Sequence, residues 1–324
     1  MVKLISDWED KLNYLGAVQK PFGFIIDFKA NNAVVVEDCV IQNDLLFDIN
    51  GVTNVNICSE SFDVSYTFQK EPIELSIYKD LFDQVYESIL YGNTFLINLT
   101  TATPISTNLS LMNIFNRSRA KYKILVKDNF VCFSPETFVK IKANIISSFP
   151  MKGTIDATIP NAKMLILNDN KEQSEHYTIV DLLRNDLSMV AKNVRLHHFR
   201  YLEKVITNQK SLLQVSSEIR GNMDYNWHEK IGTILRKLLP AGSISGAPKN
   251  KTLEIIETVE LSPRGWYTGI CGYYDGVSLD TGVMIRYIEQ IGDRLYFRSG
   301  GGITSQSHFK SEYKELIDKV YFPI

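Results

Sequence analysis

The sequence lacks several features that would point to a particular class of partner. Its 324 residues carry 35 basic and 37 acidic side chains, a formal net charge of −2, so there is no basic surplus of the kind that favours nucleic-acid binding. No apolar run approaches the ~20 residues that a membrane-spanning helix needs. The first ten residues hold three acids and no apolar export signal. We therefore expect a protein that binds neither nucleic acid nor a membrane.

Cysteine is also scarce. The four cysteines, Cys39, Cys58, Cys132 and Cys271, are widely separated and form no CxxC pair. This spacing favours reduced thiols in a cytoplasmic protein over a disulfide framework. The chain also shows no internal repeat, low-complexity stretch or linker.

Short β-type runs and helical patterns alternate irregularly along the chain, which predicts an α+β fold rather than a doubly wound sheet. Residues 1–75 contain runs such as FGFIIDF, AVVVEDCVI and DVSYTF, which predict an antiparallel meander. Residues 75–93, with apolar side chains every fourth residue, predict a helix that Gly92 ends. We expect a short β-rich segment over residues 1–75, packed on a large domain over residues 76–324.

Two later helices carry acids on one face. In the helix predicted from Lys171, Glu172, Glu175 and His176 share a face with two aliphatic residues. Taken alone, the acids are better explained as a solvated first turn, where a helix favours negative charge.

The last predicted helix, SEYKELIDKV, places Glu312, Glu315 and Lys319 on one face. Alone it is an ordinary amphipathic surface helix. If the two helices faced each other, carboxylates ~4 Å apart would repel by roughly 4 kcal/mol at the effective dielectric near a protein surface. A divalent cation would remove that cost, and Mg²⁺ suits such hard oxygen ligands.

Two other segments are candidates for binding anions, and a third can be excluded. Gly300–Gly302 follow a predicted strand and precede a helix, so their backbone N–H groups could converge on a carboxylate or phosphate, or simply form a tight turn. Arg286, inside the predicted strand VMIRYIE, is a candidate carboxylate clamp or an internal salt bridge. The segment PAGSISGAPK fails the phosphate-loop pattern, because three residues rather than four separate Gly242 and Gly246.

Lys152, in FPMKGTIDATIP, lies at the far end of a predicted hairpin whose turn is at Ala143-Asn144. A lysine in a loop is more often exposed than buried. The alternative is a buried amine that acts as a nucleophile.

Taken together, these segments resemble the chorismate-utilising enzymes, and most closely the aminodeoxychorismate synthase component I branch. The resemblance covers roughly residues 75 to 324. Its motifs, jointly specific and individually weak, are SPETFV (134–139), PMKGT (150–154), SEHYTIVDLLRNDL (174–187), PAGSISGAPK (240–249), RGWYTGICGYY (264–274), IRY (285–287) and GGGI…SEYKE…DKV (300–320).

The resemblance implies a role for each matching residue. Mg²⁺ would be held by Glu175, Glu312 and Glu315, with Glu172 close by. The general acid would be Glu136, which must be protonated near pH 7, so burial has to raise its pKa. His176, beside a metal ligand, would have a supporting catalytic role. The carboxylates of chorismate would be bound by Thr154, Gly246, Tyr267, Arg286, Gly300, Gly301, Gly302 and Lys319.

The resemblance also gives Lys152 a function. Relatives that make 4-amino-4-deoxychorismate often carry lysine here, and the implied mechanism is covalent addition of the neutral amine to C2 of chorismate. Desolvation and a nearby Mg²⁺ would lower the pKa of Lys152. Relatives that add water use a lysine in the strand written here as TFLINL, where this chain has Leu96.

Some positions depart from the family pattern. Phe149, Leu96, Tyr287 and Gln306 replace arginine, glutamine, threonine and aspartate, respectively, of close relatives. The N-terminal part is shorter than in relatives regulated by tryptophan, so we expect no tryptophan feedback.

The function that the resemblance implies is Mg²⁺-dependent aminodeoxychorismate synthase in para-aminobenzoate and folate biosynthesis. Its ammonia would come from a separate glutamine amidotransferase subunit, because the chain has no recognisable glutaminase Cys-His pair. The main alternative is anthranilate synthase component I. Lys152 argues against it, because the resemblance places a non-nucleophilic residue at this position in relatives that make anthranilate. A non-catalytic chorismate-binding protein, or a plain structural protein, fits the combined motifs less well.

Overall fold

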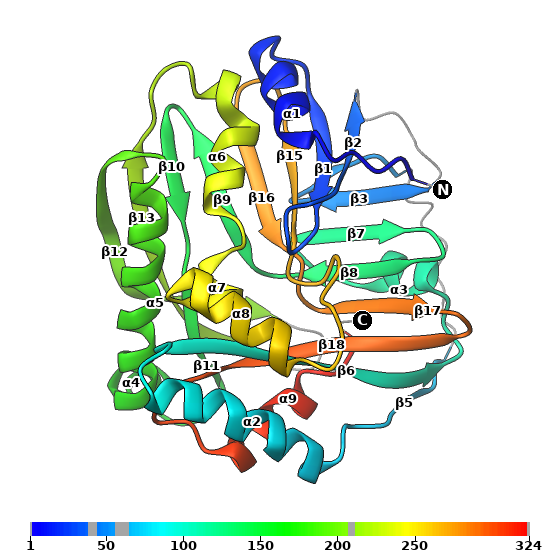
Figure 1. Ribbon diagram of the computed structural model, residues 1–324, viewed down its shortest axis with the longest axis vertical. Coiled ribbons are helices and arrows are strands. Elements are labelled where there is room, and N and C mark those ends of the chain that lie inside the picture. Colours follow the sequence, from blue (N-terminus) through cyan, green and yellow to red (C-terminus); the bar gives the residue numbers. More distant parts are fainter. Residues whose placement is uncertain (1, 38–43, 56–64, 207–210, 323–324) are drawn as a thin grey trace.

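The computed structural model describes residues 2–37, 44–55, 65–206 and 211–322. Its strands form two antiparallel sheets of nine strands each. In Figure 1 the strands of one sheet run nearly across those of the other, an orthogonal packing. This arrangement confirms the α+β prediction of antiparallel sheets flanked by helices.

The first sheet contains strands from the beginning, middle and end of the chain. Its order is β11 (Met151–Asp156), β13 (Ser211–Asn222), β10 (Ile145–Ser148), β9 (Thr137–Lys142), β16 (Leu279–Val283), β15 (Ile270–Tyr274), β1 (Phe22–Ile26) and β2 (Ala33–Glu37), with β12 (Lys192–Ile206) on β13.

The second sheet is assembled in the same way. Its order is β14 (Gly246–Ala247), β6 (Leu96–Thr107), β18 (Arg294–Ile303), β17 (Tyr287–Ile291), β8 (Phe130–Ser134), β7 (Tyr122–Val126), β3 (Leu45–Ile49) and β4 (Val52–Thr53), with β5 (Phe68–Lys70) on β6.

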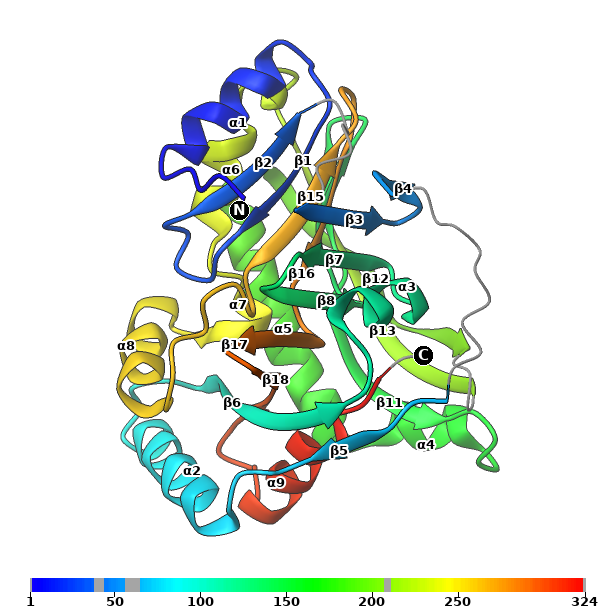
Figure 2. The same ribbon diagram turned by 90° about the vertical axis from the view of Figure 1, so that its right-hand side faces the viewer.

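Helices cover the outer faces and the ends of the sheets, as Figures 1 and 2 show. They are α1 (Trp8–Ala17), α2 (Leu75–Leu90), α3 (Leu111–Arg117), α4 (Ala162–Asn168), α5 (Asn170–Ser188), the 3-10 helix η1 (Trp227–Lys230), α6 (Ile231–Leu238), α7 (Gly242–Ser245), α8 (Lys249–Val259) and α9 (Phe309–Asp318). Among the described residues, no helix combines the length and apolar composition that crossing a membrane requires.

An apolar core fills the space between the sheets. Val36 of the first sheet packs in one cluster with Phe47 and Ile124 of the second. The two sheets can approach each other closely at Gly282 of β16, because a Cβ there would lie 2.4 Å from the ring of Tyr122 in β7. Cys132 and Cys271 are buried here as free thiols, and the other two cysteines lie outside the described residues.

The hairpin and the helix over 75–93 are confirmed, but three local predictions are wrong. Ala143 and Asn144 form the hairpin turn with φ of 50° and 60°, and α2 ends at Leu90. The N-terminal strands are not one meander, because β1 and β2 join the first sheet while β3 pairs with β7 in the second. The runs over 33–41 and 63–68 also extend beyond the described residues. The division of the chain at residue 75 stays a prediction.

The other two errors concern the end of the chain. The predicted strand VMIRYIE is not one strand: β16 ends at Val283 in one sheet, β17 begins at Tyr287 in the other, and Arg286 lies between them with φ of 54°. Gly300–Gly302 are not in a bend but inside β18, where they pair with Thr100, Leu99 and Asn98 of β6. The helix α1, which was not predicted, packs its buried Trp8, Leu12 and Leu15 into the core.

Candidate active site

One cavity of about 520 Å³ lies between the ends of β11, β13 and β18 and the helices α5, α7 and α9. That volume is in the ordinary range for a small-molecule site. The residues that sequence reasoning selected and that line this cavity are Glu136, Lys152, Thr154, Glu172, Glu175, Tyr267, Arg286, Gly300, Gly301, Gly302, Glu312, Glu315 and Lys319.

Lys152 reaches into this cavity from β11. Its Nζ donates a hydrogen bond to Oε2 of Glu175 at 2.9 Å, and its side chain is 28% exposed. A Cβ on Gly302 would lie only 3.6 Å from the same Nζ, so the glycine leaves room for the amine. The lysine is therefore not a surface loop residue.

The expected fall in the pKa of Lys152 is not found in the chain on its own. Burial does lower the pKa, but the negative charge and hydrogen bond of Glu175, with weaker contributions from Glu315 and Glu172, raise it overall. Lys152 is accordingly an ammonium group until Glu175 is engaged elsewhere or takes the proton.

Carboxylates of α5 and α9 line the same cavity, the arrangement that the family resemblance implied. Asp169 caps α5 by accepting a hydrogen bond from the N–H of Glu172, which sets the first turn beside β11. Burial, and next the charge of Glu175, raise the pKa of Glu172. Glu315 of α9 lines the same cavity, and its charge raises the pKa of Glu172 further.

Small residues line the floor beneath these carboxylates. A Cβ on Gly153 would be 3.3 Å from Oε2 of Glu172. One on Gly301 would be 3.6 Å from Oε2 of Glu312 and 3.9 Å from Oε1 of Glu315. The cavity therefore has several hard oxygen donors and open space beside them, a donor set that fits Mg²⁺.

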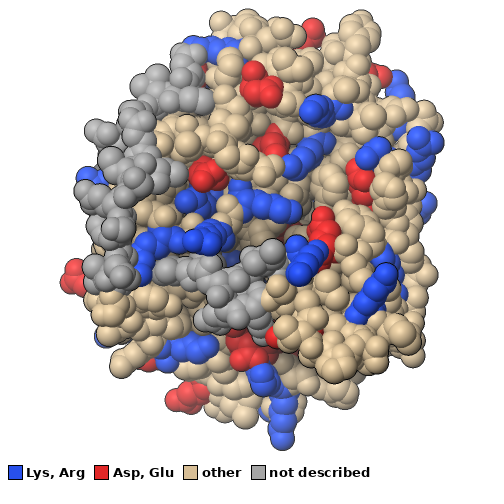
Figure 3. All heavy atoms as spheres, turned by 180° about the vertical axis from the view of Figure 1, so that it is seen from behind, with Lys and Arg blue, Asp and Glu red and all other residues tan. Residues whose placement is uncertain are grey.

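The same cavity also contains cations that could bind an anionic ligand. Nζ of Lys319, at the end of α9, contacts Oε1 of Glu315 at 2.7 Å and the carbonyl oxygen of Gly300 at 2.8 Å. Burial lowers the pKa of Lys319. Arg286 stacks over the ring of Tyr321, with 5.3 Å from its guanidinium carbon to the ring centre. Basic side chains also gather across the middle of the face seen in Figure 3, with acidic ones among them.

Glu136 has the environment that a general acid requires. Burial raises its pKa, and the hydrogen bond that Ser243 Oγ donates to its Oε1 at 2.7 Å opposes the rise. Sequence reasoning missed Ser243, which is 107 residues away along the chain. Tyr267, 3% exposed, has its pKa raised to about 12 by burial, so it is a neutral hydrogen-bonding group at physiological pH.

His176 and Gly246 are not among the residues that line the cavity. His176 is fully buried, its Nε2 lies 2.6 Å from Ser217 Oγ, and its Nδ1 has no hydrogen-bond partner among the described residues. Burial lowers its pKa to about 4, so the ring is neutral and fixes the back of α5 to β13. Gly246 pairs with Ile97 of β6 in the wall behind the cavity.

Comparison with known proteins agrees with this geometry. The family of chorismate binding enzymes matches residues 42–324. The chain belongs to that family. It is 50% identical over 313 residues to an uncharacterized PabA-like protein of Pasteurella multocida, covering 96% of this chain and 97% of that one.

Two further comparisons concern a curated relative and a solved structure of similar fold. Aminodeoxychorismate synthase component 1 of Bacillus subtilis is 30% identical over 255 residues, which are 74% of this chain but only 53% of that protein. The structure of a putative 2,3-dihydroxybenzoate-specific isochorismate synthase from Bacillus anthracis has a TM-score of 0.74 and 18% identity, over 99% of this chain and 89% of that one. This likeness extends the shared fold over nearly the whole chain.

The family departures fall in different places. Phe149 lines the cavity, whereas Leu96 is buried behind Gly302, with its Cδ1 3.1 Å from where a Cβ of that glycine would be. Tyr287 packs against Phe130 with ring centres 4.7 Å apart and does not line the cavity. Of these residues, Phe149 is the one placed to contact a ligand.

Proposed function

We propose that the protein converts chorismate and ammonia to 4-amino-4-deoxychorismate through a covalent adduct on Lys152. The observation that carries the proposal is the position of this amine, inside an acid-lined cavity and beside the glycine floor of β18. The relationship to aminodeoxychorismate synthase component 1 of Bacillus subtilis supports the same product.

The first step forms one bond and breaks another. The proton on Nζ of Lys152 has Oε2 of Glu175 as its immediate acceptor, 2.9 Å away. The freed amine adds to C2 of the ring, the double bond shifts, and the C4–O bond breaks. Glu136 gives its proton to the departing hydroxyl, which leaves as water; the raised pKa of Glu136 keeps that proton available.

The second step returns the ring double bond to its original position. Ammonia adds at C4, the double bond returns, and the C2–N bond to Lys152 breaks, which regenerates the amine. The proton that ammonia loses restores Glu136, and Glu175 returns its proton to Lys152, so chorismate and ammonia give the amino product and water.

Mg²⁺ is the cofactor that we propose for Glu172, Glu175, Glu312 and Glu315. When bound, it would neutralise the crowded carboxylates and hold a carboxylate of the substrate. Arg286, Lys319 and the backbone of Gly300–Gly302 would bind the remaining negative charge, with Thr154 at the rim.

We also propose a separate glutamine amidotransferase subunit as the source of ammonia, as the family resemblance implies. The free thiols of Cys132 and Cys271 support a cytoplasmic location.

The experiment that tests this function is product analysis. Purified protein is incubated with chorismate, Mg²⁺ and ammonium, and the products are identified by mass spectrometry. The proposal expects aminodeoxychorismate, lost in Lys152→Ala and retained in Lys163→Ala, a matched variant at an exposed lysine of α4.

Other results would contradict the proposal in distinct ways. Anthranilate with pyruvate would assign the chain to the alternative anthranilate synthase activity. Saturable chorismate binding without turnover, also when glutamine and an amidotransferase subunit are supplied, would make it a binding protein.

A further inference from the structure

A second group of polar side chains lies outside the cavity, on the paired strands β12 and β13. The register pairs Leu196 with Ile219 and then His198 with Glu218, so one extra residue, His197, is inserted in β12. Such a bulge sets two residues of one strand against one of its partner. In a regular strand the two histidines would face opposite sides; here their ring centres are 4.3 Å apart.

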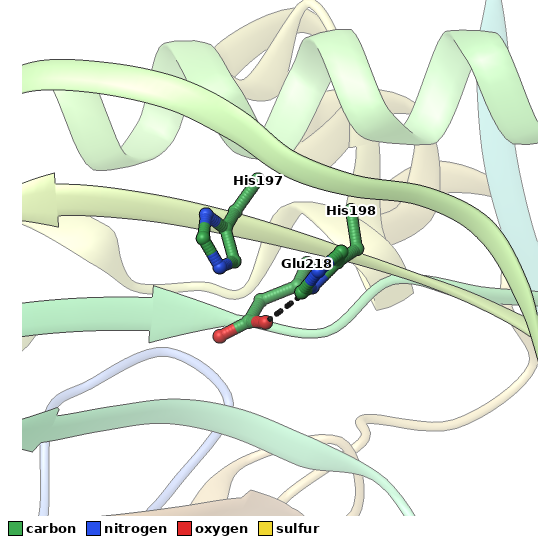
Figure 4. A group of neighbouring side chains, drawn as sticks. All are labelled: His197, His198 and Glu218. Carbon is green, nitrogen blue, oxygen red and sulfur yellow. Dashed lines mark hydrogen bonds and ion pairs between the residues drawn. The ribbon is translucent and has the colours of Figure 1, made fainter.

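The three side chains converge. One ligand atom from each of His197, His198 and Glu218 lies within 4.8 Å of the other two. Figure 4 shows the carboxylate of Glu218 beside the two imidazole rings, with one oxygen directed at His198. His198 Nδ1 is 3.3 Å from Oε2 of Glu218, while Arg220 Nε holds Oε1 at 2.6 Å.

This arrangement fixes the carboxylate in advance. Burial would raise the pKa of Glu218, but the hydrogen bonds from Arg220 and His198 outweigh it and lower the pKa, so the group is ionised at neutral pH. Arg220 occupies one oxygen and leaves the other on the histidine side. A hydrogen-bonded partner of this kind typically orients a metal-binding carboxylate.

We propose that His197, His198 and Glu218 bind a divalent first-row transition ion of the Zn²⁺ class, with the remaining coordination place open to water. Imidazole nitrogen favours such ions, whereas the all-oxygen cavity favours Mg²⁺. Bonds of about 2.0–2.1 Å require the ligand atoms to close to roughly 3.4 Å. Rotation of the two exposed histidines supplies that movement, since both rings lie at the surface.

A metal ion at this position would also link two neighbouring strands and so stabilise the fold. The ion would join the bulge of β12 to β13, where Ser217, the residue before Glu218, forms a hydrogen bond with His176 of α5. The charge of Arg220 opposes the ion, so we expect a labile site that exchanges with solvent.

Zn²⁺ titration by calorimetry tests the proposal on the full chain without a histidine tag and with Mg²⁺ in excess. We expect one saturable Zn²⁺ site per chain and a rise in melting temperature on Zn²⁺ addition. Mutation of a residue that only hydrogen-bonds a metal ligand already lowers metal affinity roughly 10- to 100-fold. His197→Ala and His198→Ala each remove a ligand, so each should weaken Zn²⁺ binding by at least roughly tenfold.

The matched control is His308→Ala, an exposed histidine that precedes α9. It should bind Zn²⁺ like the unchanged chain. The proposal fails if Zn²⁺ does not saturate a site, if His308→Ala loses affinity equally, or if Glu172→Gln rather than His197→Ala abolishes binding. The last result would place the ion in the carboxylate cavity.

Discussion

Replacement of Ser243 by alanine should move the alkaline limit of activity to higher pH. Ser243 Oγ donates a 2.7 Å hydrogen bond to Oε1 of Glu136, and this bond lowers the pKa that burial raises. Glu136 must be protonated to act as general acid, so kcat/KM falls as pH rises through its pKa. Loss of the hydroxyl leaves the carboxylate less stabilised and raises that pKa further.

The size of the shift follows from the strength of the bond. A hydrogen bond to a charged group contributes roughly 1.5–3 kcal/mol. Because 1.36 kcal/mol corresponds to about one pKa unit, the alkaline limb should move up by about 1–2 pH units. Water entering the space of the lost hydroxyl would bring the shift toward the lower figure.

The assay is the pH profile of kcat/KM for chorismate with ammonium and Mg²⁺. Ser245→Ala is the matched control, because Ser245 is buried in the same helix, α7, but bonds the carbonyl oxygen of Ala241 at 2.8 Å. Its profile should match that of the unchanged protein. An alkaline limb that stays in place in Ser243→Ala, or moves to lower pH, refutes the role of Glu136 as the acid.

Three further predictions concern stability and regulation. Arg264→Met leaves the carboxylate of Glu260 buried without its cationic partner, with the hydrogen bonds from Thr100 remaining (the side chains of Arg264 and Glu260 are 1% and 4% exposed), at a cost of about 3–5 kcal/mol or about 4–7 °C in melting temperature. The control is the exposed ion pair of Lys29 with Glu257, where Lys29→Met should lower the melting temperature by about 1 °C or less. Equal falls in melting temperature for the two variants would contradict the prediction. Gly246→Ala puts a Cβ 2.0 Å from the carbonyl oxygen of Leu96 at φ of 134°, so little folded protein should be recovered; a normal melting curve would show the wall behind the cavity to be adaptable. Calorimetry with tryptophan should show no tight binding, and a saturable site would overturn the expectation of no feedback.

Features set by neighbouring residues could be predicted from the sequence. Apolar spacing located α2, α5 and α9, whereas the shared cavity of the acids on the last two helices was implied only by the family resemblance. Ala143 and Asn144 marked the hairpin turn correctly, since a short loop between two β-type runs has few solutions. The spacing of Trp8, Leu12 and Leu15 would also have predicted α1, had the N-terminal segment not been taken as all β.

Features that depend on contacts between distant parts of the chain could not be predicted from the sequence. The triple glycine resembles a turn locally, and only pairing with β6, about 200 residues earlier, makes it a strand. Arg286 lies at the point where the chain passes from one sheet to the other, which apolar spacing does not mark. The contact between Ser243 and Glu136, and the net rise in the pKa of Lys152, depend on side chains that only folding brings together.

The most direct test of the account is to look for the covalent adduct on Lys152. The protein is incubated with chorismate and Mg²⁺ in the absence of ammonia, and its intact mass and proteolytic peptides are measured. The peptide that contains Lys152 should gain the mass of chorismate less one water. Its central claim would be contradicted by an unmodified peptide together with undiminished aminodeoxychorismate formation by Lys152→Ala.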